Sequence, residues 1–398
     1  MPPLSVGNYT ATTALGAGRD AQLEALRARR SGLRANDMRS PGGHDLLETW
    51  IGRVEGVEAV ALPATLADWD CRNNRLAWLA LQQDGMMESI AALRDAHGAE
   101  RVAIVVGTST SSIGATEEAY ARLQDGRFPA DLQRPRIHTP HSLGAFVEAA
   151  TGLRGPCITV ATACSSSAKV LAQAARLIEG AGLADAALVG GVDTLCGSVL
   201  YGFNALGLVS PRPCRPFDAR RDGLSLGEAG GFAILERAAP GERGLQLRGY
   251  GESSDAHHMS APHPEGLGAQ LAMREALQRA GLEAGDIDYL NLHGTATPAN
   301  DKVEALAVAA LFPPSLHASS TKGWTGHTLG AAGIVESAFA LLALEHGLLP
   351  GMLGSSEHDP GNGPQLRFDN AQREVAFAMN NSFGFGGNNC SLVFGRAA

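Results

Sequence analysis

The stretch VATACSSSAK, residues 160–169, decides how this chain folds and where its chemistry lies. Apolar residues 157–160 predict a short strand, and the Ala- and Leu-rich residues that follow predict a helix running to about Glu179. Cys164 falls in the turn between them. Unpaired backbone N–H groups and the helix dipole favour the thiolate form at such a position. Cys164 is therefore a candidate nucleophile, although a lone cysteine is more often a small packing residue.

Length and composition indicate a globular protein with two domains or one large two-part domain. The chain has 398 residues, of which 44% are hydrophobic and 18% charged, and its net charge of -9 argues against a general nucleic-acid binder. The six cysteines show no CxxC pair and no metal-ligand spacing, which predicts reduced thiols in a cytoplasmic protein without a metal site.

No membrane segment or secretory signal is expected. The N-terminal residues lack a basic region followed by an apolar block. The most apolar predicted helix, near residues 334–344, is short, contains Glu336 and is followed by Glu345 and His346, which argues against a membrane span.

The order of predicted elements repeats in two halves, 1–240 and 241–398, separated by the Pro- and Gly-containing linker 239–244. In the first half a strand ends in GTST, residues 107–110, and the turn at Cys164 opens a helix. In the second half a strand ends in HGTAT, residues 293–297, and another turn opens the helix 331–345. Such halves place both helix N-termini at one central pseudo-twofold seam.

Three further groups of residues are candidates for the same site. His293 follows a strand, Lys322 and His327 lie in a strand-to-helix turn, and FGFGG at 383–387 closes a strand. Taken singly, each has a plainer interpretation: a capped loop histidine, a solvated lysine, a histidine bonded to a helix start, and phenylalanines packed beside a bulge. The glycine-rich loop lacks the Gly-Lys-Ser/Thr ending of a phosphate-binding P-loop.

Together these motifs resemble the β-ketoacyl-acyl-carrier-protein synthases, in particular condensing enzymes I and II of fatty-acid synthesis and their polyketide relatives. The resemblance covers nearly the whole chain. It implies an α/β, thiolase-like fold with two pseudo-equivalent βαβαβ halves in a five-layered αβαβα arrangement. The motifs that carry it are TACSS at 162–166, RPFD at 215–218 with RDG at 221–223, HGTATP at 293–298, TK at 321–322 with GH at 326–327 and GAAG at 330–333, and NSFGFGG at 381–387.

The resemblance implies a decarboxylative Claisen condensation in fatty-acid or polyketide and polyene chain elongation. Cys164 would accept an acyl group from acyl carrier protein, and malonyl carrier protein would lose CO2 to give the attacking enolate. The N–H groups of Cys164 and Phe385 would form the oxyanion hole, while the neutral imidazoles of His293 and His327 would hold the malonyl thioester oxygen. No cofactor is implied, since the carrier protein's phosphopantetheine arm carries both substrates.

The resemblance also assigns supporting roles to residues around this centre. Lys322 would act electrostatically, with Glu336 as its partner. Thr295 and Thr297 match residues that bind the phosphopantetheine arm. Phe385, between glycines, matches the gate that admits the second substrate after acylation.

Two departures from the family pattern bear on the acyl substrate. Thr110 stands where synthase II often has a bulky apolar residue in the acyl pocket, and Asn388 stands where threonine is usual. A smaller and more polar pocket favours a polyunsaturated or aryl-primed substrate, as in a specialised polyketide or aryl polyene ketosynthase.

Several alternatives stay open. A thiolase would carry a second catalytic cysteine, but Cys390 falls at the start of a strand, which indicates packing. A chain-initiating synthase would use Cys-His-Asn, and a cysteine-dependent hydrolase would need no malonyl substrate. A non-catalytic chain-length factor typically lacks the nucleophile. The family implies a homodimer, or a heterodimer with such a factor, and no nucleic-acid or membrane partner.

Overall fold

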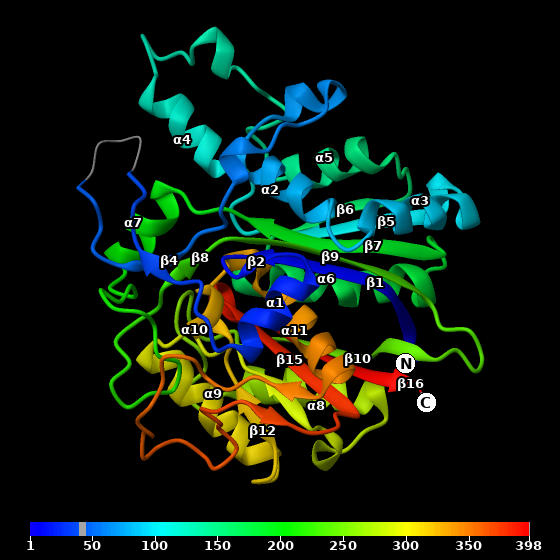
Figure 1. The fold of residues 1–398 in the computed structure, drawn as a ribbon, viewed down its shortest axis with the longest axis vertical. Coiled ribbons are helices and arrows are strands. Elements are labelled where there is room, and N and C mark those ends of the chain that lie inside the picture. The colour runs from blue at the N-terminus through cyan, green and yellow to red at the C-terminus, as the bar shows by residue number, and fades with distance from the viewer. Residues whose placement is uncertain (40–44, 398) are drawn as a thin grey trace.

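The computed structural model describes residues 1–39 and 45–397, and an eleven-stranded mixed sheet runs through it (Figure 1). In the N-terminal half the strand order is β6-β5-β7-β9-β1, with β6 and β7 parallel to β5 and with β9 antiparallel to both β7 and β1. These strands are β1 (Leu4–Thr13), β5 (Val102–Gly107), β6 (Cys157–Val160), β7 (Ala186–Asp193) and β9 (Ala229–Arg237).

The C-terminal half repeats this topology. Its order, β12-β11-β15-β16-β10, has β12 and β15 parallel to β11, and β16 antiparallel to β15 and β10. In both halves the first strand pairs with the last, then come the fourth, second and third, which confirms the predicted pseudo-equivalent halves. The strands are β10 (Gly244–Ser254), β11 (Tyr289–Asn291), β12 (His317–Ser319), β15 (Phe377–Gly384) and β16 (Asn388–Ala397).

The two halves meet where β1 pairs antiparallel with β10, at Leu4 opposite Leu247 and Ser5 opposite Gln246. Short strands complete the described elements: β2 (Gly16–Ala17) on β1, β3 (Arg34–Ala35) with β4 (Trp50–Gly52) and β8 (Leu226–Gly227), and β13 (Leu348–Leu349) with β14 (Ala371–Gln372).

The helices form three layers, which gives the predicted αβαβα arrangement (Figure 1). Helices α2 (Arg72–Leu81), α3 (Met86–His97) and α5 (Ser142–Thr151) cover the outer face of the first half-sheet. Helices α8 (Leu267–Ala280) and α9 (Pro298–Leu311) cover the second. Between the half-sheets lie α6 (Ser166–Ala175) and α11 (Ala332–His346). The remaining helices are α1 (Arg19–Arg27), α4 (Ile113–Ala121), α7 (Gly197–Ala205) and α10 (Lys322–Thr325).

Glycines allow the close packing of this middle layer. A Cβ on Gly107, at the end of β5, would lie 2.5 Å from the backbone N of Ser167 in α6. A Cβ on Gly333 in α11 would lie 2.3 Å from the backbone N of Ala168 in α6. Since real Cβ atoms do not approach so closely, these two glycines allow α6 to contact both β5 and α11.

Two sequence-based predictions need correction. Apolar residues at helical spacing predict one helix over 75–97, but the structure has two, because the helix is interrupted at 82–85, where Gly85 takes a positive φ of 66°. Residues Leu329–His346 are long and apolar enough to suit a membrane span, contrary to the expectation from their length. In this fold 89% of that segment is buried, because α11 packs between the two half-sheets.

Candidate active site

Cys164 lies in the turn Ala163–Ser165, between β6 and the first residue of α6. Its side chain is 5% exposed, and the preceding Ala163 has a φ of 53°, which a residue with a Cβ rarely adopts. The Ser166 hydroxyl helps to fix the turn, since it accepts from the Thr162 N–H and donates to the Ala163 carbonyl. The cysteine is thus presented on a strained, tightly held turn at the helix start, as predicted.

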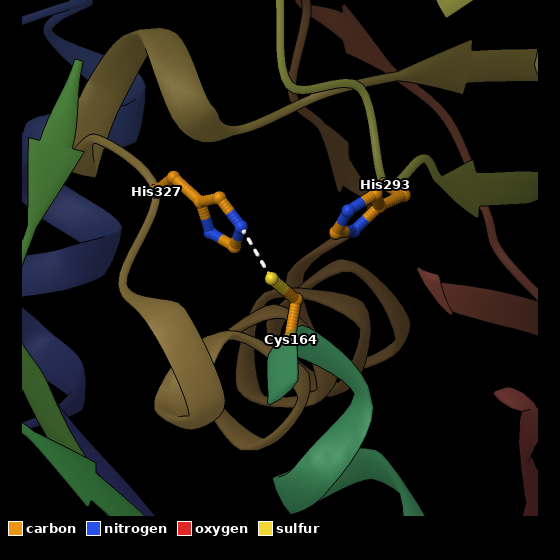
Figure 2. A group of neighbouring side chains, drawn as sticks. All are labelled: Cys164, His293 and His327. Carbon is orange, nitrogen blue, oxygen red and sulfur yellow. Dashed lines mark hydrogen bonds between the residues drawn. The ribbon is translucent and has the colours of Figure 1, made fainter. Parts of the chain in front are cut away.

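Two histidines from the other half face this thiol (Figure 2). Nε2 of His327 lies 3.0 Å from Sγ of Cys164. The rings of His293 and His327 stand almost perpendicular, with centroids 5.4 Å apart. One ligand-type atom from each of the three residues lies within 4.8 Å of the others. The structure therefore brings together the three residues predicted from separate motifs.

Burial determines the protonation of this trio. It raises the pKa of Cys164 to about 12; Asp193 and Glu336 add to the rise, and Lys322 and a Phe385 backbone hydrogen bond oppose it. The turn position had predicted a thiolate, but here desolvation outweighs the helix start, and the resting side chain is a thiol. Burial, assisted by Lys322, also holds the pKa of both His293 and His327 well below 6.5, so both imidazoles are neutral as predicted.

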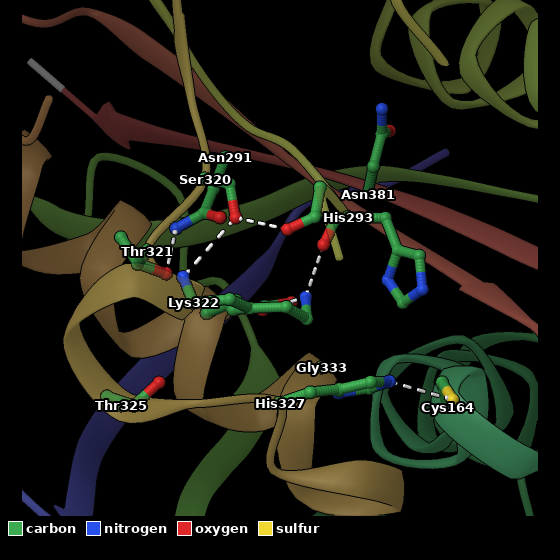
Figure 3. A network of polar contacts seen from close by, with 12 residues as sticks. Cys164, Asn291, His293, Ser320, Thr321, Lys322, Thr325, His327, Gly333 and Asn381 are labelled. Carbon is green, nitrogen blue, oxygen red and sulfur yellow. Dashed lines mark hydrogen bonds and ion pairs between the residues drawn. The ribbon is translucent and has the colours of Figure 1, made fainter. Parts of the chain in front are cut away.

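Lys322 lies beside His293 and His327 (Figure 3). Its ammonium forms a buried ion pair with Glu336. The Lys322 ammonium donates to Glu336 Oε1 and to the backbone carbonyl of His293, each at 2.5 Å. This contact confirms the predicted partner of Lys322. Burial raises the pKa of Glu336 to about 7 despite the lysine. The pair ties α10 and α11 to the segment that carries His293.

Glu304 on α9 is a supporting residue that the sequence motifs did not identify. Its carboxylate accepts from the backbone N–H groups of His293 and Gly294, each at 2.8 Å, and from the Asn381 side-chain amide. Burial raises its pKa to about 7. The sequence could have indicated this role, because α9 begins directly after the HGTAT motif and Glu304 lies in the second turn of that helix.

A cavity opens onto Cys164 and both histidines. Thr295 and Thr297 line it, and their hydroxyl oxygens lie 2.8 Å apart. Apolar walls come from Phe203 and Leu224, among others. The two threonines are thus placed along the route by which a substrate would reach the thiol.

The loop at 384–387 forms part of the wall of this cavity. Phe385 stacks on Phe203 with ring centroids 5.8 Å apart. Gly386 and Gly387 have φ values of 81° and 71°, which glycine adopts without strain. The Gly386 N–H donates to the Met259 carbonyl, and the Gly387 carbonyl accepts from the Asp255 N–H. Phe385 thus lies in the cavity wall beside Phe203, on a loop whose two following glycines are held by backbone hydrogen bonds.

Thr110, predicted to line the acyl pocket, does not line the cavity described above. Its hydroxyl donates to Asp193 at 2.9 Å. The backbone after β5 curls around the carboxylate of Asp193 and takes the Thr110 hydroxyl with it.

Comparisons with known proteins agree with this geometry. Residues 73–240 match the family described as beta-ketoacyl synthase, N-terminal domain, and residues 245–356 match beta-ketoacyl synthase, C-terminal domain. The chain is 37% identical to the mitochondrial 3-oxoacyl-acyl-carrier-protein synthase of Arabidopsis thaliana, over 74% of this chain and 68% of that protein. It is 30% identical to 3-oxoacyl-acyl-carrier-protein synthase 2 of Staphylococcus aureus, over 89% and 98% of the two chains.

A solved structure is similar along its whole length. A chain of the complex between the ketosynthase ApeO and its chain length factor ApeC, from Xenorhabdus doucetiae, gives a TM-score of 0.90 at 35% identity. The similarity covers 100% of this chain and 98% of the other. The family match, the curated relatives and the fold agree, and the chain belongs to the β-ketoacyl synthase family, the acyltransferase-type condensing enzymes of the thiolase superfamily.

Proposed function

We propose that this enzyme condenses an acyl group held on Cys164 with malonyl carrier protein, giving β-ketoacyl carrier protein and CO2. The observation that carries the proposal is the convergence of one thiol and two neutral imidazoles at the end of a single cavity. The carrier protein follows from the curated relatives, which are named for acyl carrier protein. Its phosphopantetheine arm would lie along Thr295 and Thr297.

Acylation begins with the thiol. Because the resting thiol is neutral, its proton must leave as the sulfur attacks the thioester carbonyl, and His327 Nε2 at 3.0 Å is placed to take it. The backbone N–H groups of Cys164 and Phe385 would bind the oxyanion. The tetrahedral intermediate then expels the pantetheine thiolate, which receives the proton from His327.

In condensation the imidazoles donate hydrogen bonds, whereas in acylation His327 accepts a proton. Once the sulfur is acylated it has no proton to donate, and His327 can carry its own proton on Nε2. Nδ1 of both His293 and His327 is buried without a hydrogen-bond partner in the described residues, so no contact at that atom fixes either tautomer. N–H groups from both rings would stabilise the enolate oxygen as the bond from the malonyl carbon to CO2 breaks. The enolate attacks the acyl carbonyl, the carbon–sulfur bond breaks, and the Cys164 thiolate takes a proton from solvent.

A second chain completes the proposed enzyme. In the described residues β6 pairs on one side only, and its four residues are partly exposed. An unpaired strand edge is a surface on which another chain can continue a sheet. The similarity to a chain of a complex between a ketosynthase and its chain length factor favours such a factor as the partner over a second copy of this chain. The six free cysteines suit the reducing cytoplasm.

A non-catalytic subunit is the main alternative, and one assay separates the two. The purified chain, alone and with a co-expressed chain length factor, is given acyl and malonyl carrier proteins, and β-ketoacyl product is detected by mass spectrometry. The proposal expects product from the wild type and at least about a 10⁴-fold loss in Cys164→Ala. Equal product from the Cys164→Ala assembly would mean that the partner supplies the nucleophile.

A further inference from the structure

Asp193 is a buried carboxylate that joins the two halves of the molecule beside the catalytic centre. It is the last residue of β7, and its side chain is fully buried. Six hydrogen bonds end on its two oxygens: the hydroxyls of Thr108, Ser109 and Thr110, the backbone N–H groups of Ser109 and Thr110, and the backbone N–H of Gly330. Five come from the N-terminal half, and the sixth crosses to the turn that follows His327.

The hydrogen bond from Gly330 to Asp193 forms where the two segments approach so closely that position 330 has no room for a Cβ. A Cβ on Gly330 would lie 2.5 Å from the Ser109 backbone N and 2.6 Å from Asp193 Oδ2. The preceding Leu329 has a φ of 57°, which is costly for a residue with a Cβ. Strained backbone of this kind persists only where its surroundings enforce it. The 2.7 Å bond from the Gly330 N–H to Asp193 is one such constraint.

The turn that contains Gly330 also positions His327 relative to Cys164. His327 lies three residues before Gly330, and its Nε2 lies 3.0 Å from Sγ of Cys164. Leu329–Ala331, just before α11, occupies the position that Ala163–Ser165 occupies just before α6 in the other half. The first residue of each turn has a positive φ. Asp193 holds the turn Leu329–Ala331, and a movement of this turn would carry His327 away from the thiol.

We propose that Asp193 is a positioning residue that fixes the His327-bearing turn over Cys164. The inference rests on the proposed condensation for its kinetic part only. Asp193 is one of the groups that raise the Cys164 pKa, together with burial itself. A protonated thiol is protected from alkylation and oxidation until a thioester binds and His327 takes the proton as the sulfur attacks the thioester carbonyl.

Two readouts test the proposal in the full-length enzyme with its partner. In Asp193→Asn, which removes the charge but keeps one acceptor, kcat for condensation should fall about tenfold or more, with KM for malonyl carrier protein changed by less than about threefold. Alkylation of Cys164 by iodoacetamide at pH 8, followed on the Cys164 peptide by mass spectrometry, should become at least about threefold faster.

Matched variants separate positioning from folding. Asp84→Asn removes a charge that binds Arg19 and the Thr10 hydroxyl far from the site, and it should leave both readouts near wild type. Thr110→Val removes a single donor to Asp193 and gives a milder test if Asp193→Asn does not fold, with kcat lowered about two- to fivefold. Wild-type kcat together with an unchanged alkylation rate in these Asp193-directed variants would overturn the proposal. Failure of the wild type to make product would refute the condensation, while the alkylation contrast would still test Asp193.

Discussion

At the scale of single residues, burial determines how the nucleophile works. A thiol with a pKa of about 12 is almost wholly protonated near neutral pH, so attack on a thioester requires a base in contact with the sulfur. His327 makes that contact, while His293 approaches the ring of His327 instead. The two histidines therefore have separable roles in acylation and shared roles in decarboxylation.

Replacing the histidines one at a time should reveal this division. His327→Ala should slow acylation of Cys164 about 10²-fold or more, because the base is lost. His293→Ala should leave acylation within a few-fold of wild type and suppress CO2 release from malonyl carrier protein by a similar 10²-fold factor, because a donor to the enolate is lost. Rapid-quench mass spectrometry of the Cys164 peptide and release of labelled CO2 measure the two steps.

His346→Ala, an exposed change at the end of α11, is the matched control and should alter neither step. Equal slowing of acylation by the His293 and His327 variants would contradict the assignment of the base.

The residues that the sequence missed share one physical feature. Glu304 and Asp193 both accept hydrogen bonds from backbone N–H groups outside their own element: Glu304 from His293, 11 residues earlier, and Asp193 from Gly330, 137 residues later. Such bonds depend on the tertiary structure: no local motif indicates the bond between Asp193 and Gly330, whereas Glu304 could have been found from its place in the helix that follows the HGTAT motif. Thr110 shows the same limit: its position after a strand was predictable, but the carboxylate that captures its hydroxyl was not.

At the scale of elements, the sequence predicts the order of strands and helices better than it predicts where a helix is interrupted. The strand-turn-helix at Cys164 and its counterpart before α11 were predictable, because apolar runs alternate there with small residues at the turns. The break between α2 and α3 was not, since apolar spacing continues through Gln82–Gly85 while the backbone leaves the helix. For α11, hydropathy alone suits a membrane, and only the two half-sheets around it account for its apolar faces.

At the scale of the whole molecule, the site stands where the two halves meet, and it concentrates buried carboxyl groups there. Burial raises the pKa of Glu304 and Glu336 to about 7, and that of Asp301 to about 6. The folded chain therefore holds protons that the unfolded chain releases near pH 4.5. Unfolding releases these protons between pH 4.5 and 7, so stability from these groups is complete below that window and is lost above it.

The variant Glu304→Gln measures the contribution of Glu304 to this pH dependence of stability. The variant cannot ionise and keeps one acceptor oxygen, so it can accept from only one of the His293 and Gly294 N–H groups at all pH values. The free energy of unfolding of the wild type, relative to the variant, should fall by up to about 3 kcal/mol from pH 4.5 to pH 8. Urea denaturation at each pH measures it, with the exposed Glu265→Gln as control. A difference that stayed constant, or grew with pH, would show that Glu304 is ionised throughout.

The most direct test of the whole account is a pulse and chase on Cys164 in the intact enzyme. Incubation with acyl carrier protein should add one acyl mass to the Cys164 peptide and to no other cysteine peptide. Malonyl carrier protein should then remove that mass while CO2 and β-ketoacyl carrier protein appear in equal amounts. An acyl mass that never forms on Cys164, or one that leaves as free acid without β-ketoacyl product, would contradict the account.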